Sequence, residues 1–283
     1  MGLFVTALFV ILLSIFIWKA YNNTKNIQLE RITINNGKKQ CCNTLNVLQI
    51  SDMHLENISI SPEELYDQLK DEDIDLIALT GDYLDRKRTL KKLPAYLEVF
   101  KQLKPTLGCF AVFGNHDYVL KEPYFAHLEK TLNEFGVRTF RNEHTQIVMH
   151  GLMINIIGID DYSTGRSRLS DSYHALNEAD FNLVLTHDPN IILNMKDHPF
   201  DYLLSGHFHN GQIHWPKPYH LIKMGKLARM RMVQGLHYMY GKPFYISEGL
   251  GQTGINIRVG SRPEITIHKL SLSKEKTQTE SAS

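Results

Sequence analysis

Short apolar runs rich in β-branched and aromatic residues recur along the chain from residue 45 onward, with helical patterns between several of them. Short runs of this kind are typical of strands that are buried on both faces of a sheet. We predict strands at Leu45–Ile50, Ile74–Leu79, Gly108–Phe113, Met153–Ile159, Phe181–Leu185 and Asp201–Leu204. The alternation of strands with helices restricts the chain to an α/β fold in which helices cover central sheets.

The helical segments carry recognisable start signals. A helix is predicted from Pro62, because proline is favoured at the first helical position and two glutamates follow it in the first turn. The stretches Leu93–Leu103 and Pro123–Phe135 repeat this pattern less cleanly. In Gln146–Ile159 a His-Gly pair separates two apolar runs, which predicts a β-hairpin.

Polar side chains of a restricted kind follow five of the predicted strands at the point where each strand ends. In an α/β sheet, residues beyond the carboxyl ends of the strands converge on one crevice, and ligands bind there. We therefore expect a single site to contain Asp52 and His54, Asp82, Asn115 with His116 and Asp117, His187, and His207 with His209.

The donor types at these strand ends indicate the chemistry. Asp, His and Asn without cysteine suit borderline divalent metals such as Mn, Fe, Zn or Co. Two cations about 3.5–4 Å apart need a shared carboxylate, and Asp82 in its Gly-Asp turn is placed for that role. Such a pair can activate water and stabilise an in-line phosphoryl transfer, and a nearby imidazole can protonate the leaving oxygen.

Each motif has an ordinary structural explanation when it is taken alone. A Gly-Asp pair after a strand is usually a turn, and His207 and His209, which their spacing would place on one face of a strand, would usually be structural. The structural explanation fails for the whole set, because all five motifs occur at strand ends. The sequence therefore predicts a metal site.

The series Asp52-x-His54, Gly81-Asp82, Gly114-Asn115-His116-Asp117, His187 and Gly206-His207-x-His209 resembles the calcineurin-like metallophosphoesterases. The resemblance covers about residues 45–270, with the blocks in family order. It implies a four-layer α/β/β/α sandwich of the metallo-dependent phosphatase type, in which two mixed sheets pack face to face with helices outside. No ligand position is substituted, which argues against an inactive version of the fold.

The resemblance also implies a role for each residue. The seven metal ligands would divide into a first group of Asp52, His54 and His209, a second group of Asn115, His187 and His207, and a bridging Asp82. His116 would be the uncoordinated catalytic imidazole. Asp117 would either orient His116 or serve as a turn residue.

Finer features resemble a membrane-associated bacterial branch of that family. The segment after His209 reads Asn-Gly-Gln where the branch has Gly-Gly-Gln, so Asn210 departs from its pattern. Residues 248–251, 258 and 263–265 resemble the closing block of the branch. Within that block, Arg258 would either contact a substrate phosphate or stabilise the fold.

Residues 2–18 form an apolar run that only Thr6 and Ser14 interrupt and Lys19 ends. A membrane-spanning helix needs about 20 residues, with roughly 17 as the lower limit. No basic residue precedes the run and no small-residue cleavage site follows it. A transmembrane anchor is therefore favoured over a cleaved signal peptide, and a buried core helix comes third.

Charge and cysteine usage suggest a location and an organisation. The basic residues flanking the anchor follow it, which places the catalytic domain on the cytoplasmic side of a single-pass cell-membrane protein. The three cysteines do not make a disulfide framework, in mild agreement with a reducing compartment.

We divide the chain into the anchor at 2–18, a linker and first strand at 19–44, a catalytic domain at 45–270 and a disordered tail at 271–283, and we expect a monomer.

A basic, apolar insert is expected at 213–242. No Asp or Glu lies between Tyr202 and Ser247, while six Lys or Arg residues alternate there with Trp, Tyr, Leu, Ile and Met. One interpretation is a solvated loop with a few buried side chains. The other is that residues 217–242 form a surface that meets anionic lipid or an amphiphilic phosphate substrate.

The favoured function is metal-dependent hydrolysis of a phosphodiester or phosphomonoester, and its more specific version is cleavage of a lipid-linked phosphate or pyrophosphate. A nuclease is an alternative, although the net charge of +1 and the lack of a basic stripe outside the insert make nucleic acid an unexpected partner. A metal-bound interaction module without turnover is the other alternative. The complete ligand set and His116 argue against it.

Overall fold

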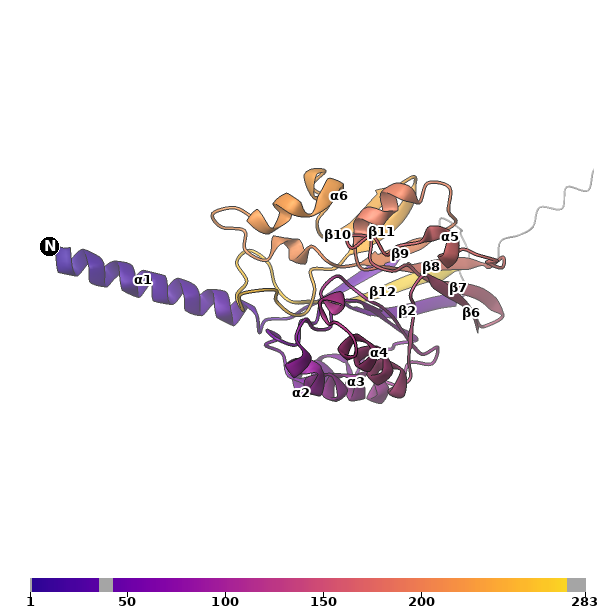
Figure 1. Cartoon of the computed structure of the whole chain (residues 1–283), viewed down its shortest axis with the longest axis horizontal. Coiled ribbons are helices and arrows are strands. Elements are labelled where there is room, and N and C mark those ends of the chain that lie inside the picture. Colours follow the sequence, from indigo (N-terminus) through magenta and orange to yellow (C-terminus); the bar gives the residue numbers. More distant parts are fainter. Residues whose placement is uncertain (1, 36–42, 274–283) are drawn as a thin grey trace, which may run out of the picture.

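The computed structural model describes residues 2–35 and 43–273 of the chain. Two sheets pack face to face in the domain that follows the N-terminal helix (Figure 1). The first sheet is mixed and six-stranded, with β2 to β5 parallel and β12 antiparallel to β2. In spatial order its strands are β1 (Gln28–Ile34), β12 (Glu264–Leu272), β2 (Asn43–Ile50), β3 (Leu76–Thr80), β4 (Cys109–Val112) and β5 (Val137–Thr139).

The second sheet is also mixed and six-stranded. Its central strands β7, β8, β9 and β11 are parallel, and an antiparallel strand lies at each edge. In spatial order its strands are β10 (Gly235–Met239), β11 (Lys242–Ile246), β9 (Tyr202–Ser205), β8 (Phe181–Leu185), β7 (Leu152–Gly158) and β6 (Glu143–Met149).

Helices cover the outer faces of both sheets. The first sheet is covered by α2 (Pro62–Leu69), α3 (Leu93–Gln102) and α4 (Tyr124–Glu134), and the second by α5 (Leu169–Ser172), α6 (Gly225–Arg229) and the 3-10 turn η3 (Pro189–Asn194) (Figure 1). Successive residues of β2 show why the strands are apolar throughout. Leu48 packs toward the helices, whereas Val47 packs between the sheets, because side chains alternate along a strand. The four-layer sandwich that the resemblance implied is confirmed.

The predicted elements differ from the observed ones mainly at their ends. The predicted strand at Ile74–Leu79 is β3, which starts two residues later, and the predicted hairpin is confirmed as β6 and β7. The helix start at Pro62 is confirmed, with a reciprocal capping box between Ser61 and Glu64. Strand β12 continues to Leu272, past the expected start of the tail, and residues 274–283 lie outside the described residues.

Two assigned segments hold more regular structure than the sequence suggested. The 19–44 segment, assigned as a linker and first strand, contains strand β1 and also the end of the first helix, while residues 36–42 lie outside the described part of the chain. The insert at 213–242 holds the 3-10 turn η5 (Tyr219–Lys223), α6 and the edge strand β10. Part of the insert is therefore built into the second sheet and its helical cover.

The first helix, α1 (Gly2–Asn23), projects from the domain (Figure 1). Within the described chain it is the one helix long and apolar enough to cross a membrane, with a window of mean hydropathy 2.4 that is 6% buried. By length and composition a signal sequence would qualify as well. Its last turn is anchored, because Ala20 is buried and its carbonyl accepts the backbone N–H of Arg258 at 2.9 Å.

Candidate metal centre

The predicted donors lie beyond the carboxyl ends of five strands, as parallel strands require. Strands β2, β3 and β4 supply the carboxylates, His54, Asn115 and His116, and strands β8 and β9 of the other sheet supply the remaining imidazoles. The site therefore sits where the ends of the two packed sheets meet. His207 and His209 lie in the loop after β9, so the expectation that they share one face of a strand is wrong.

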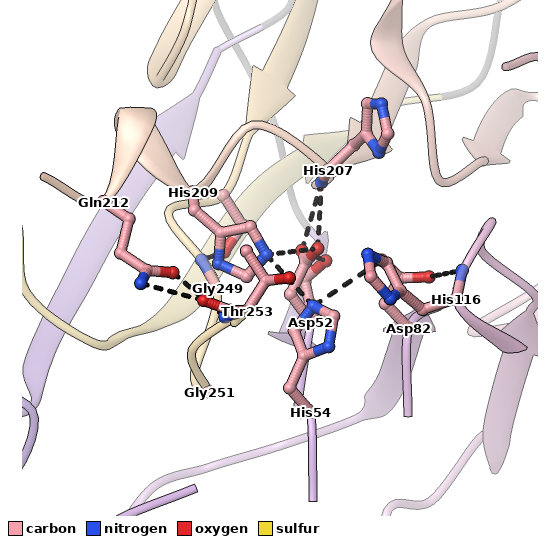
Figure 2. A network of polar contacts seen from close by, with 12 residues as sticks. Asp52, His54, Asp82, His116, His207, His209, Gln212, Gly249, Gly251 and Thr253 are labelled. Atoms are coloured by element: carbon pink, nitrogen blue, oxygen red, sulfur yellow. Dashed lines mark hydrogen bonds and ion pairs between the residues drawn. The ribbon is translucent and has the colours of Figure 1, made fainter. Parts of the chain in front are cut away.

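One group of donors contains Asp52, His54 and His209. The Nε2 atoms of His54 and His209 are 3.1 Å apart, and His209 Nε2 lies 3.3 Å from Asp52 Oδ1. All three side chains are at most 2% exposed. Figure 2 shows the three side chains converging around Asp52.

A second group contains Asp82, His187 and His207. His187 Nε2 lies 3.1 Å from Asp82 Oδ2 and 3.1 Å from His207 Nδ1. The other nitrogen of His187 is 2.9 Å from the carbonyl oxygen of Thr80, a contact that requires Nδ1–H and leaves Nε2 facing the group. Asp82 Oδ2 is also 3.6 Å from His54 Nε2, so this carboxylate contacts both groups.

The donor atoms fit a pair of metal ions. Nitrogen and oxygen atoms that each lie about 2.1 Å from a common ion are about 3–3.5 Å from one another, as these are. Asn115 adds a second observation, because its Oδ1 is buried and has no hydrogen-bond partner among the described residues. Buried polar atoms are nearly always partnered, so such an oxygen is suited to a cation.

The backbone of the site is strained. Five of the seven expected ligands have positive φ angles between 38° and 75°: Asp52, His54, Asp82, His207 and His209. Non-glycine residues rarely adopt this region, and each one costs on the order of 1–3 kcal/mol. Such strain clusters at functional sites. Asn210, with φ of 48°, is a suitable replacement for glycine because asparagine tolerates the left-handed region better than most residues.

The electrostatics of the site favour cations. Burial raises the pKa of both Asp52 and Asp82, but the neighbouring histidines together lower it by more than burial raises it. Both pKa values therefore end below the ordinary range. Burial lowers the pKa of His54 to about 3 and also lowers that of His207. Against the effect of burial, Asp82 and Asp52 raise the pKa of His187. Two buried carboxylates next to the neutral imidazoles of His54 and His207 are the protonation states that metal ligands need, whereas His187 would have to release a proton when a metal binds.

Asp117 does not contact the His116 ring. Its carboxylate accepts backbone N–H bonds of 2.8 Å from Asp82, Tyr83 and Gly114, so it holds the turn that carries Asp82. Of the two roles expected for Asp117, these contacts are those of the turn role. Burial and the charge of Asp82 raise the pKa of Asp117, and the donated N–H bonds oppose that rise.

Asp85 is the carboxylate that contacts His116, and sequence reasoning missed it. Its Oδ2 lies 3.4 Å from Nδ1 of His116. The ring of His116 is about a quarter exposed and stands edge-on to His54 at 4.8 Å, between the donors and solvent. The position of Asp85 three residues after Asp82, in the same strand-end loop, could have identified it.

Arg258 is structural. Its side chain is fully buried, and its guanidinium donates to the carbonyl oxygens of Glu248, Gly249, Gly251 and Arg262. Burial lowers its pKa to about 10. The suggestion that Arg258 reaches a substrate phosphate is therefore corrected. Through these bonds it braces the loop whose Gly251 N–H donates to the Asp52 carbonyl.

Two packed mixed sheets with His/Asp donor clusters at their strand ends define a metal-dependent phosphoric ester hydrolase. Residues 45–211 match the family model described as calcineurin-like phosphoesterase, and the chain belongs to this family. It is a metallophosphoesterase.

The chain is similar to three relatives over most of its length, at different levels of identity. The chain is 59% identical over 275 residues to the uncharacterized metallophosphoesterase YkoQ of Bacillus subtilis, covering 93% of this chain and 100% of the relative. It is 30% identical over 200 residues to the phosphodiesterase YaeI of Escherichia coli, covering 69% and 70%. It is 26% identical over 305 residues to the UDP-2,3-diacylglucosamine pyrophosphatase LpxG of Chlamydia muridarum, covering 89% and 92%.

Proposed function

We propose that the chain hydrolyses a phosphodiester or pyrophosphate bond of a membrane-associated substrate with two divalent cations. Asp52, His54 and His209 would hold one ion, and Asn115, His187 and His207 the other, with Asp82 shared between them. The observation that carries this proposal is the position of Asp82, whose Oδ2 lies within 3.6 Å of imidazoles from both groups. A shared carboxylate is what two closely spaced cations require.

The bound cations, whether Mn, Fe, Zn or Co, would supply the Lewis acidity that offsets negative charge on the phosphate. The oxygen of water forms the new bond to phosphorus and releases a proton to solvent, and the bond from phosphorus to the leaving oxygen breaks. His116 lies at the exposed edge of the donors, and we assign it the transfer of a proton to that leaving oxygen. Its backbone N–H donates to Asp82 Oδ1 at 2.8 Å, which ties the position of the imidazole to the bridging carboxylate.

Hydrolysis of bis(p-nitrophenyl) phosphate with added Mn²⁺ tests these roles. We expect Asp82→Ala to lose metal and activity together, whereas His116→Ala should keep two ions per chain and lose about 100-fold or more in kcat. Elemental analysis of each variant separates the two effects. If the unmodified chain showed no Mn²⁺-dependent turnover above that of the two variants, the assignment would be rejected and an interaction module favoured.

The membrane part of the proposal is supported by α1 and by one relative. An apolar helix exposed on all sides needs a lipid environment or a partner helix. LpxG is named for a pyrophosphatase activity on a nucleotide-linked lipid. We infer that α1 is a single-pass anchor in the cell membrane, that the catalytic domain is cytoplasmic, and that the chain belongs to a membrane-associated branch of the family.

Expression of the full chain in Bacillus subtilis tests this arrangement. The protein should stay in the membrane pellet after an alkaline carbonate wash, at its full mass of 32.6 kDa. Its domain should resist trypsin added outside intact spheroplasts and become sensitive after lysis. A product shortened by the length of α1 would identify a signal peptide, and cleavage in intact spheroplasts would place the domain outside.

A further inference from the structure

An apolar cavity of about 390 Å³ lies between the start of the basic insert and the loop after Gly251. Its apolar lining is formed by Ile213, Trp215, Pro216, Tyr219 and Ile255. Trp215, Tyr219 and Ile255 are each at least 60% exposed, which is unusual for large apolar side chains grouped in one place. The volume lies within the range of ligand pockets.

One wall of this cavity is formed by the loop that carries His209. Gln212, which lines the cavity, follows His209 by three residues. Its side chain donates to the carbonyl oxygens of Thr253 and Ile255 and accepts the N–H of Thr253. Figure 2 shows Gln212 and Thr253 beside His209 in a single polar network. A molecule in the cavity would therefore contact the loop that supplies one of the expected metal ligands.

The opposite side of the cavity touches the N-terminal helix. The rings of Phe16 and Trp215 are 5.9 Å apart at an angle of 65°. Phe16 lies just inside the end of the apolar run, where Trp18 and Lys19 mark the expected membrane interface. A helix advances about 1.5 Å per residue, so Trp215 sits within about one helical turn of that interface. The cavity thus opens at the depth where acyl chains meet lipid headgroups.

The insert that begins at the cavity is basic, and its Lys217 lines the cavity itself. Five exposed cations, Lys217, Lys223, Lys226, Arg229 and Arg231, occur in this part of the insert, and no acidic residue lies between Tyr202 and Ser247. None of the five forms an ion pair within residues 2–35 and 43–273. Unpaired cations beside an exposed apolar surface are suited to anionic headgroups.

We infer that the cavity holds the hydrocarbon chain of an amphiphilic phosphate ester that enters from the bilayer, while the ester phosphate lies at the metal centre. The inference rests on the proposed hydrolase function and names the substrate class of that site. Contact with α1, the unpaired cations of the insert and the loop shared with His209 each point to this one occupant.

A pair of chromogenic diesters with the same scissile bond tests the inference. We compare p-nitrophenyl ethyl phosphate with p-nitrophenyl octyl phosphate, using the full chain in phosphatidylcholine vesicles. Each buried methylene adds up to roughly fourfold in binding. We expect kcat/KM for the octyl ester to exceed that for the ethyl ester at least tenfold, and Ile255→Glu to bring the ratio close to one.

Ile222→Glu is the matched control. Ile222 is 67% exposed, close to the 65% of Ile255, and lies in the same basic region, but it does not line the cavity. This control should keep the octyl preference. Equal loss in both variants would assign the preference to partition into the bilayer and overturn the inference. Hydrolysis of both esters at the same kcat/KM would also overturn it and leave the hydrolase function standing, whereas no hydrolysis of either ester would reject the function itself.

Tryptophan emission gives a readout that does not depend on turnover. The chain has two tryptophans, so Trp18→Phe leaves Trp215 as the single reporter. Octylphosphonate, which has no ester bond, should shift the emission of Trp215 to the blue, and ethylphosphonate should not. An unchanged spectrum with both compounds would contradict the inference.

Discussion

Asp85 and Asp117 both lie beside the metal donors but contact different groups. Asp85 contacts the His116 imidazole, and Asp117 accepts backbone N–H bonds of the Asp82 turn. Asp85→Asn should leave the His116 ring less well oriented while the metal ligands stay in place. Substitution of groups that orient a functional histidine typically costs about 10- to 100-fold. We therefore expect a loss of this size in kcat for bis(p-nitrophenyl) phosphate, with KM, thermal stability and two ions per chain retained.

Asp117→Asn should give the opposite pattern. An amide would direct N–H groups at the backbone donors of Asp82 and Gly114, which loses hydrogen bonds in a buried site and costs about 1–3 kcal/mol. The melting temperature should fall, and the metal content should fall with it because the Asp82 turn is loosened. If Asp117→Asn instead kept stability and metal but lost kcat alone, Asp117 would act on His116, which is the other of the two roles expected from the sequence.

At the scale of the elements, six strands could be predicted because they are central strands buried on both faces, although the central strands β11 and β12 were not among them. Phe181–Leu185 was located to the residue, since its apolar run coincides with β8. The edge strands β1 and β10 carry more exposed side chains and no clear apolar run, so the sequence placed a first strand only somewhere within 19–44 and did not locate β10. The donors were found because the carboxyl ends of parallel strands converge whatever the loop details are.

The contacts between neighbouring strand ends could not be predicted. A methyl group at Gly114 would lie 2.2 Å from Asp82 Oδ1, and one at Gly206 would lie 2.1 Å from Asp52 Oδ2. Both glycines therefore let a backbone approach a metal-site carboxylate, a tertiary contact that no local pattern encodes. The role of Asp117 was uncertain for the same reason, because its partners come from the loop after a different strand.

At the scale of the whole molecule, the junction of the two sheets near Glu264 carries a pH dependence. Glu264 is 5% exposed and accepts hydrogen bonds from Tyr245 and Thr266. Burial, together with nearby Glu248, raises its pKa to about 7 from an ordinary value of 4.5, although the two hydrogen bonds oppose the rise. The folded protein thus binds this proton more tightly than the unfolded chain does, and stability is lost as pH rises between these values.

Glu264→Gln, whose side chain cannot ionise, should remove this loss of stability at higher pH. The shift corresponds to about 3 kcal/mol, so the variant should gain about that much relative to the unmodified chain between pH 5 and pH 8. Urea unfolding of both proteins in the same detergent at each pH measures the difference, in which the other titrating groups cancel. Glu143→Gln, at an exposed position on β6, is the control and should show no trend. A constant difference across this range would mean that Glu264 keeps its charge in the folded protein and that its hydrogen bonds outweigh its burial.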